Sequence, residues 1–179
     1  LALRLSSSRI YNYESINSEN LHAWFTGDGM TYLYNGDLLQ FGDAFWPTVN
    51  PYRLPGTTVD TAPRTNGSGQ STASAANWVG GASLDGAWGV AGMELDAFGS
   101  PLTARKSWFC FDDEVVCLGA GITSTNSSVI ETTVENRRLA GAGTNEFRVN
   151  GAAMPATIGW SNALTGVTSC WLNGVGGYF

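Results

Sequence analysis

The residues best suited to chemistry gather in one short stretch near the N-terminus. Positions 11–24 hold two acids, three amides, three large aromatic residues and the single histidine of the chain. Acids and amides can bind sugar hydroxyls, and flat aromatic rings can stack on sugar rings. A second aromatic group follows at Phe45, Trp46 and Tyr52. The pattern is equally typical of a polar edge loop beside a half-buried aromatic core, so sugar binding and a structural role both stay open.

Several other catalytic chemistries lack the residues that they need. A serine or cysteine nucleophile requires a histidine base, which would have to be His22, and the sequence has neither a GxSxG motif nor a cysteine nucleophile signature. We therefore expect His22 to be structural or exposed. The glycine strings LGAGITS and LNGVGGYF lack a strand-to-helix setting, so they are interpreted as turns and not as phosphate sites.

A glycosidase would need two facing carboxylates, and the sequence alone does not pair any. The candidate acids are Glu14, Glu19, Asp28, Asp43 and Asp60. Asp28 and Asp37 each stand next to a glycine, so turn roles are the preferred interpretation for both.

The three cysteines, Cys110, Cys117 and Cys170, do not form a metal-binding pattern, because a structural zinc site needs four ligands and the chain has one histidine. The run WFCFDDEVVCL is typical of a strand, a tight turn and a second strand. A turn at Asp113-Glu114 would place Cys110 and Cys117 opposite each other. A cross-strand disulfide is then possible, and two buried thiols are the preferred interpretation.

Composition and charge exclude two classes of function. The 179 residues carry 15 acids against 9 bases, a formal charge of −6, which disfavours nucleic-acid binding. The basic pairs Arg105-Lys106 and Arg137-Arg138 are interpreted as solvated strand edges. No apolar run approaches the roughly 20 residues that a membrane-spanning helix needs, so we expect no membrane partner.

Short runs of alternating apolar and polar residues, separated by turn signals, predict an all-β chain folded as an antiparallel β-sandwich. Residues 61–76 are the strongest candidate for a long loop, which could lie over a site. The one weak helical candidate, 73–81, suits a loop equally well. The sequence begins and ends in strand-like runs, which indicates a piece of a longer protein. The expected strands lie at residues 1–5, 30–34, 90–95, 108–111, 115–118, 130–134 and 147–149, and the expected turns include Gly141–Gly143.

Four segments resemble polysaccharide lyase family 8, which contains the hyaluronate, chondroitin AC and xanthan lyases. They are NYESINSENLHAWFTGDGMTYLYNGD, FWPTVNPYRLPGTTVD, ARKSWFCFDDEVVCLGAGITS and ETTVENRRL, in that order. The resemblance implies a parent with a catalytic helical toroid followed by a β supersandwich. Residues 1–179 are similar to the first part of that β region, as a single fragment, and the toroid lies outside them.

The family cleaves uronic-acid polysaccharides by β-elimination, using a tyrosine, a histidine and an asparagine of the toroid. The resemblance implies that Glu14 orients the toroid's arginine and histidine, and that Asn17 faces the substrate. Glu19 and Asn20 complete the same YE-x-x-N-x-EN motif as further substrate-binding residues. The resemblance implies no cofactor. Some relatives hold a cation near the tryptophan that aligns with Trp46, but only Asp60 is suitably placed here, so we predict no metal.

The expected partners are an acidic polysaccharide, such as hyaluronan or chondroitin, and the toroid of the same parent. A polymer of this size cannot enter a cell intact, so secretion is expected. The charge of −6 has the wrong sign to attract a polyanion, and a basic toroid could supply the attraction. The alternatives are a noncatalytic sugar-binding module that uses Trp24 and Trp46, and a purely structural domain. In every case the isolated chain is expected not to turn over substrate.

Overall fold

The computed structural model describes residues 1–42, 44–139 and 145–179. Asp43 and the expected turn at Gly141–Gly143 lie outside these ranges. The chain forms two compact units, which are described separately. The larger unit comprises Leu1–Leu33 and Pro47–Asn136, and the smaller unit comprises Tyr34–Trp46 and Arg137–Phe179.

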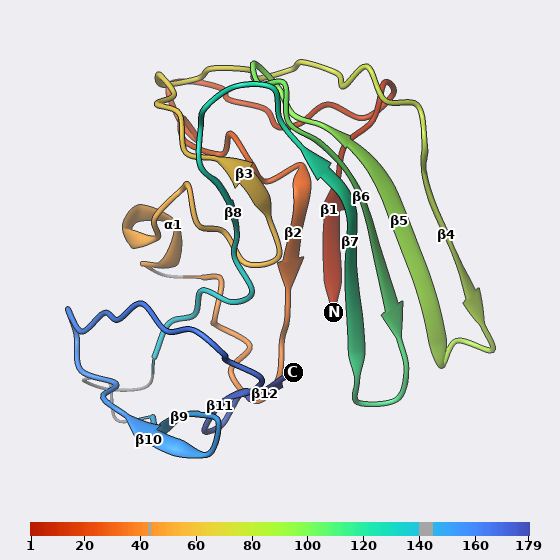
Figure 1. The fold of residues 1–179 in the computed structure, drawn as a ribbon. Helices are drawn as coiled ribbons and strands as arrows, with labels where there is room; N and C mark the ends of the chain where they lie inside the picture. The colour runs from red at the N-terminus through yellow and green to blue at the C-terminus, as the bar shows by residue number, and fades with distance from the viewer. Residues whose placement is uncertain (43, 140–144) are drawn as a thin grey trace. The chain divides into compact units, whose positions relative to one another are not determined.

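The larger unit is built around a curved sheet of four antiparallel strands, coloured green to teal in Figure 1. The strands are joined in chain order, so each one pairs with the next along the sequence. Between the first two strands the chain reverses at Asp85 and Gly86, whose φ angles of 53° and 69° suit a tight hairpin turn. The strands are β4 (Val79–Leu84), β5 (Trp88–Asp96), β6 (Thr103–Cys110) and β7 (Val115–Thr123).

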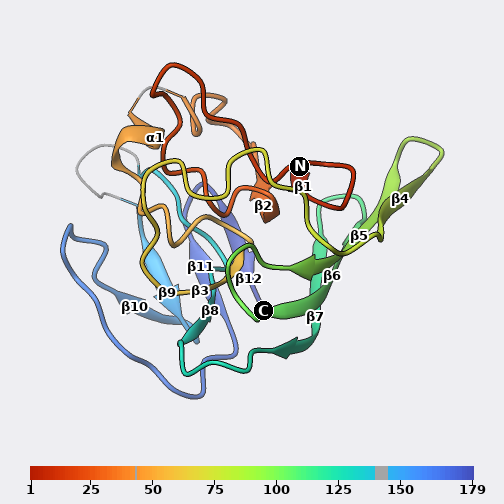
Figure 2. The same ribbon diagram turned by 90° about the horizontal axis from the view of Figure 1, so that it is seen from above.

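Two antiparallel strand pairs complete the larger unit, and Figure 2 gives the view from above. β1 (Ala2–Leu5) pairs with β2 (Asp28–Tyr32), and β3 (Thr58–Asp60) pairs with β8 (Ile130–Thr132). Side chains of β1 and β8 pack against the core cluster on β5 and β6, so the larger unit has two layers. This arrangement confirms the predicted antiparallel sandwich. The core cluster contains Met93, Leu95, Ala97, Leu102, Ala104 and Trp108.

The smaller unit has a sheet of four short antiparallel strands in the order β10-β9-β11-β12. Asn35 ties the first segment of this unit to the second, because its side-chain amide donates to the Gly174 carbonyl at 2.9 Å. Asp37 and Arg138 form an ion pair at 2.9 Å between the same two segments. The strands are β9 (Phe147–Val149), β10 (Ala152–Met154), β11 (Cys170–Leu172) and β12 (Gly176–Tyr178).

The expected strands are confirmed, although their bounds differ by a few residues. Of the two interpretations left open for 73–81, the helix is wrong and the loop holds for 73–78, while residues 79–81 already belong to β4. The described residues contain one helix, α1 (Phe45–Thr48), which is a single turn. Residues 61–76 form the expected long loop.

Two predictions about charged residues are wrong. Lys106 is buried and not part of a solvated edge, because it alternates with Ala104 and Trp108 on the inner face of β6. Its neighbour Arg105 is exposed, as expected. Asp28 is the first residue of β2 and is buried; its backbone N–H closes the turn before the strand by donating to the Phe25 carbonyl at 3.0 Å, but its carboxylate makes no turn hydrogen bond with any described residue, so the expected side-chain role is wrong. Asp37 does have one, because its carboxylate accepts a hydrogen bond from the backbone N–H of Leu39 at 2.9 Å.

The preferred interpretation of Cys110 and Cys117 as free thiols is confirmed, but the expected placement of the two residues opposite each other and the expected burial of both are wrong. Phe111–Glu114 form the connection between β6 and β7, so Cys110 pairs with Val115, and Cys117 faces Trp108. Cys110 and Cys117 are therefore diagonal neighbours, about 7–8 Å apart, whereas a disulfide rarely exceeds about 6.8 Å between Cα atoms. All three thiols are free, and Cys117 is exposed.

We therefore expect the free energy of unfolding to be the same in the presence and absence of dithiothreitol. Urea denaturation under the two conditions measures it. A disulfide would contribute about 2–4 kcal/mol, so a loss of that size on reduction would contradict this structure. Cys117→Ser is the matched control, because this variant cannot form the Cys110–Cys117 bridge.

Candidate functional site

The four site residues predicted from the sequence lie together on one exposed loop, Glu14–Asn20. Tyr13 anchors the start of this loop in the larger unit. Its ring is buried, its hydroxyl donates to the Ser68 carbonyl at 2.8 Å, and its own carbonyl accepts from the Ser71 N–H at 2.8 Å. The long loop 61–76 thus holds the site loop in place.

The site loop is also held by hydrogen bonds within itself. The Glu19 N–H donates to the Ile16 carbonyl at 2.9 Å, and the Ser15 hydroxyl donates to the Glu19 carbonyl at 2.6 Å. Asn20 closes the loop, because its side-chain amide donates to the Glu14 carbonyl at 2.7 Å. Asn20 therefore shapes the loop, which adds a structural role to the expected substrate contact.

Three residues of the site loop have left-handed backbone conformations. The φ angles are 53° for Asn17, 63° for Ser18 and 56° for Asn20. Asparagine tolerates this region better than most residues, and such conformations persist only where the surrounding structure enforces them. They turn the loop sharply, so that a fixed backbone presents its polar side chains to the outside.

The polar groups at the surface of the loop are open to a partner. Within the described ranges, the side chains of Glu14, Asn17 and Glu19 make no hydrogen bond or ion pair, and all three residues are exposed. Carboxylates in this state can accept hydrogen bonds from a guanidinium, an imidazolium or a sugar hydroxyl. The arrangement is suited to binding and orienting other groups.

The aromatic residues behind the loop belong mainly to the core. Trp24 is 7% exposed, donates from its indole N–H to the Thr65 carbonyl at 3.0 Å, and lies 5.2 Å from the Tyr52 ring. His22 is exposed and makes a 2.9 Å hydrogen bond with the Asn66 amide oxygen, which agrees with a structural role. The core interpretation therefore holds for Trp24, which has no free face for a sugar. Trp46 is 43% exposed, so the core interpretation does not hold for it.

The larger unit contains a buried group of charged side chains, which the sequence did not indicate. Its members are Asp28, Asp60, Arg64 and Lys106. The Lys106 ammonium donates to the backbone carbonyls of Asp28, at 3.2 Å, and Gly56. Arg64 pairs with Asp60 at 2.9 Å, and both side chains are buried. Gly29 lies beside this group: its φ is 91°, and a Cβ there would lie 2.9 Å from the Trp108 ring and 3.0 Å from the Lys106 Nζ.

Burial shifts the pKa values of two of these charges toward each other. The pKa of Asp28 is raised to about 7 by burial, against the attraction of Lys106 and Arg64. The pKa of Lys106 is lowered to about 8 by burial, against the attraction of Asp28. The free energy of unfolding therefore depends on the protonation of Asp28 and Lys106.

The described residues also bear on metal binding and on membrane spanning. No group of three or more His, Cys, Asp or Glu side chains within residues 1–42, 44–139 and 145–179 is arranged to hold a metal ion. One oxygen of Asp60, the acid considered for a cation, is already paired with Arg64. No helix in the described part of the chain is long and apolar enough to cross a membrane.

The whole chain, residues 1–179, matches the profile of the polysaccharide lyase family 8 super-sandwich domain. The chain belongs to polysaccharide lyase family 8. This confirms the resemblance carried by the four sequence segments, and it agrees with the two-layered antiparallel fold of the larger unit.

Relatives of this family 8 chain include lyases named for different polymers. It is 54% identical to a Paenibacillus xanthan lyase of known structure, with a TM-score of 0.88 over 95% of this chain and 16% of that one. It is 44% identical to a hyaluronate lyase of Thermasporomyces composti, over 99% of this chain and 23% of the relative. A Streptomyces coelicolor A3 chondroitin AC lyase, solved in complex with chondroitin sulphate, is 42% identical with a TM-score of 0.82, over 98% of this chain and 22% of that one. The family 8 chain thus spans about a fifth of the length of these relatives.

Proposed function

We propose that this chain works within a longer secreted lyase that cleaves uronic-acid polysaccharides, such as hyaluronan or chondroitin, by β-elimination. The observation that carries the proposal is the site loop, on which the Glu14 carboxylate and the Asn17 amide are exposed and make no hydrogen bond within the described ranges. Membership of family 8, together with relatives named as hyaluronate and chondroitin AC lyases, supports the reaction class.

In the proposed reaction, a base removes the proton at C5 of the uronate, the C4–O glycosidic bond breaks, and a C4=C5 double bond forms. The leaving oxygen takes up a proton. We assign the base and acid to a helical toroid elsewhere in the longer protein. Glu14 orients an arginine and a histidine of that toroid through charge-assisted hydrogen bonds, while Asn17, Glu19 and Asn20 contact the substrate.

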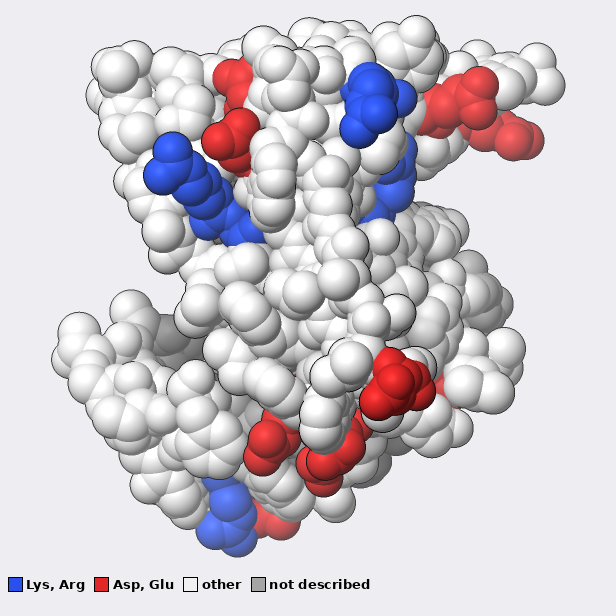
Figure 3. Space-filling model, turned by 90° about the vertical axis from the view of Figure 1, so that its right-hand side faces the viewer, with Lys and Arg blue, Asp and Glu red and all other residues white. Residues whose placement is uncertain are grey.

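The charge of the chain is consistent with a supporting role in this reaction. In the face shown in Figure 3, the blue and red side chains are scattered among wide uncharged areas, without a continuous basic surface that would attract a polyanion. We therefore expect the toroid to supply most of the attraction for the substrate, and the isolated chain to show no turnover.

The test is an absorbance assay on the longer protein with hyaluronan, chondroitin sulfate and xanthan side by side. The double bond of the unsaturated uronate absorbs in the near ultraviolet, so elimination raises the absorbance and hydrolysis does not. A rise with one polymer identifies the substrate. Xanthan is included because of the 54% identity to a xanthan lyase. Cleavage that gives only saturated ends would overturn the proposal.

A further inference from the structure

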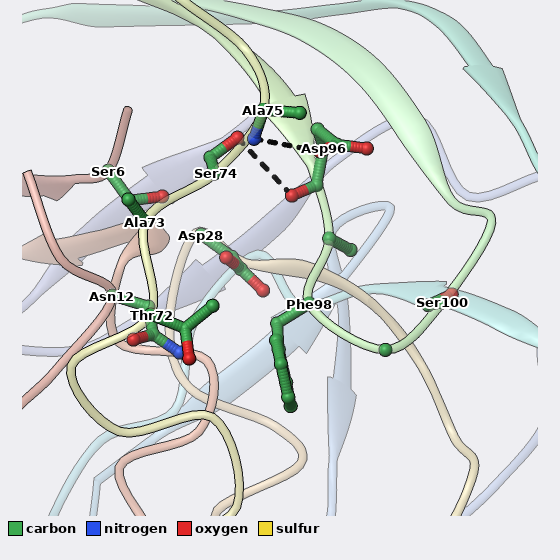
Figure 4. A pocket seen from close by; sticks show the side chains of 12 residues that line it. Ser6, Asn12, Asp28, Thr72, Ala73, Ser74, Ala75, Asp96, Phe98 and Ser100 are labelled. Carbon is green, nitrogen blue, oxygen red and sulfur yellow. Dashed lines mark hydrogen bonds between the residues drawn. The ribbon is translucent and has the colours of Figure 1, made fainter. Parts of the chain in front are cut away.

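The larger unit contains a cavity of about 380 Å³, a volume within the range of small-molecule sites. Strand ends and loops form its wall, including residues 72–75 of the long loop and residues 96–100 after β5. Figure 4 shows the carboxyl of Asp28 directed into this space, with Asn12 and Thr72 on one side and Phe98 on the other.

Two polar side chains of the cavity wall are more than nine-tenths buried and have an unpaired group. Asn12 is 5% exposed, and its amide orientation is fixed because its Oδ1 accepts from the Tyr13 N–H at 2.9 Å. Its Nδ2 group then has no hydrogen-bond partner among the described residues. Asp28 is also 5% exposed, and within the same ranges no hydrogen bond reaches its carboxylate. Buried polar groups are normally paired, so both call for a partner from outside the protein.

The types of these groups restrict the chemistry of that partner. The unpaired group of Asn12 is a donor, so it would face a metal cation with its positive end. Asp28 and Asp96 would repel a uronate or phosphate, and one oxygen of Asp96 already accepts from the Ala75 N–H at 3.1 Å. A neutral hydroxyl group, which both donates and accepts, satisfies Asn12 and Asp28 together.

We propose that this cavity binds an uncharged sugar ring, with hydroxyls bonded to Asn12 and Asp28 and one ring face against Phe98. Phe98 is 40% exposed at the cavity, and its ring lies against Gly69, where a Cβ would come within 2.4 Å of it. Gly69 thus fixes the aromatic wall at which a sugar can stack. The raised pKa of Asp28, about 7, lets its carboxyl also donate to a hydroxyl in mildly acid solution.

The test is a titration of the chain with methyl β-glucopyranoside, followed by ¹H–¹⁵N NMR of the Asn12 side-chain amide. We expect this signal to shift and saturate, while glucuronate binds at least roughly tenfold more weakly because two carboxylates face it. Asn12→Ala and Phe98→Leu should each weaken binding roughly tenfold. Phe98→Leu lies at the partly exposed wall, so it tests the site even if Asn12→Ala impairs folding.

Asp113→Asn, an exposed residue of the β6–β7 connection, is the control and should bind the glycoside like the unmodified chain. An Asn12 signal that does not move, or equal binding by every variant, would overturn the proposal and leave the cavity filled by water only. Because the measurement needs no elimination activity, its failure is distinguishable from failure of the proposed lyase function.

Discussion

Glu14→Gln in the longer lyase is expected to lower kcat roughly 10–100-fold, the range for losing a group that orients a catalytic side chain. The carboxylate of Glu14 is exposed and makes no hydrogen bond within the described ranges, so it is available to the arginine and the histidine that we propose for the toroid. An amide keeps the size of the side chain and removes the charge that holds those partners. KM should change little, because Glu14 is assigned no substrate contact.

The pH dependence of kcat separates this positioning role from a structural one. A nearby carboxylate raises the pKa of a histidine, so its removal should move the acid limb of the kcat profile to lower pH. The thermal midpoint should stay within about 1 °C, as expected for an exposed residue. Glu114→Gln, on the exposed β6–β7 connection, is the matched control. An unchanged kcat for Glu14→Gln, or a lower kcat with a lowered thermal midpoint and no movement of the acid limb, would refute the assignment.

The alternating pattern was sufficient to predict the strands whose inner face is large and apolar. In β5 and β6 the inward positions carry Met93, Leu95 and Trp108, so a period of two was visible in the sequence. β4 was missed because Gly80, Gly81 and exposed residues leave it without such a face, and its position depends on hydrogen bonds to β5. Lys106 obeyed the same period, but its charge suggested the surface.

That Glu14, Asn17, Glu19 and Asn20 lie on one loop was predictable because they are close together in the sequence, while their roles were implied by the family resemblance and remain proposals. The shape of the site loop was not predictable, since nothing in the composition of Glu14–Asn20 assigns left-handed conformations to Asn17, Ser18 and Asn20. The cavity could not be predicted either, because its wall combines Asn12, Asp28 and the ends of segments that are far apart in the chain. Partners at long sequence separation become visible only when the fold brings them together.

The stability of the chain is expected to pass through a minimum between about pH 7 and pH 8 because of Asp28 and Lys106. Folding raises the pKa of Asp28 from 3.8 to about 7, so between these values the folded state binds more protons than the unfolded state. The free energy of unfolding therefore falls as pH rises through this window. Folding lowers the pKa of Lys106 from 10.5 to about 8, so the unfolded state binds more protons there, and stability rises again.

Each limb of this profile should amount to a few kcal/mol, since one pKa unit corresponds to about 1.4 kcal/mol. Urea denaturation at a series of pH values from 4 to about 10 measures both limbs. Asp28→Asn should remove the fall in stability below pH 7, and Lys106→Met should remove the rise above pH 8. Each variant removes one of the two titrating groups and leaves the other in place. Arg64 and Asp60, which also act on Asp28, stay in place in both variants. Asp113→Asn should keep the whole profile, whereas a fall that persists in Asp28→Asn would mean that another group controls it.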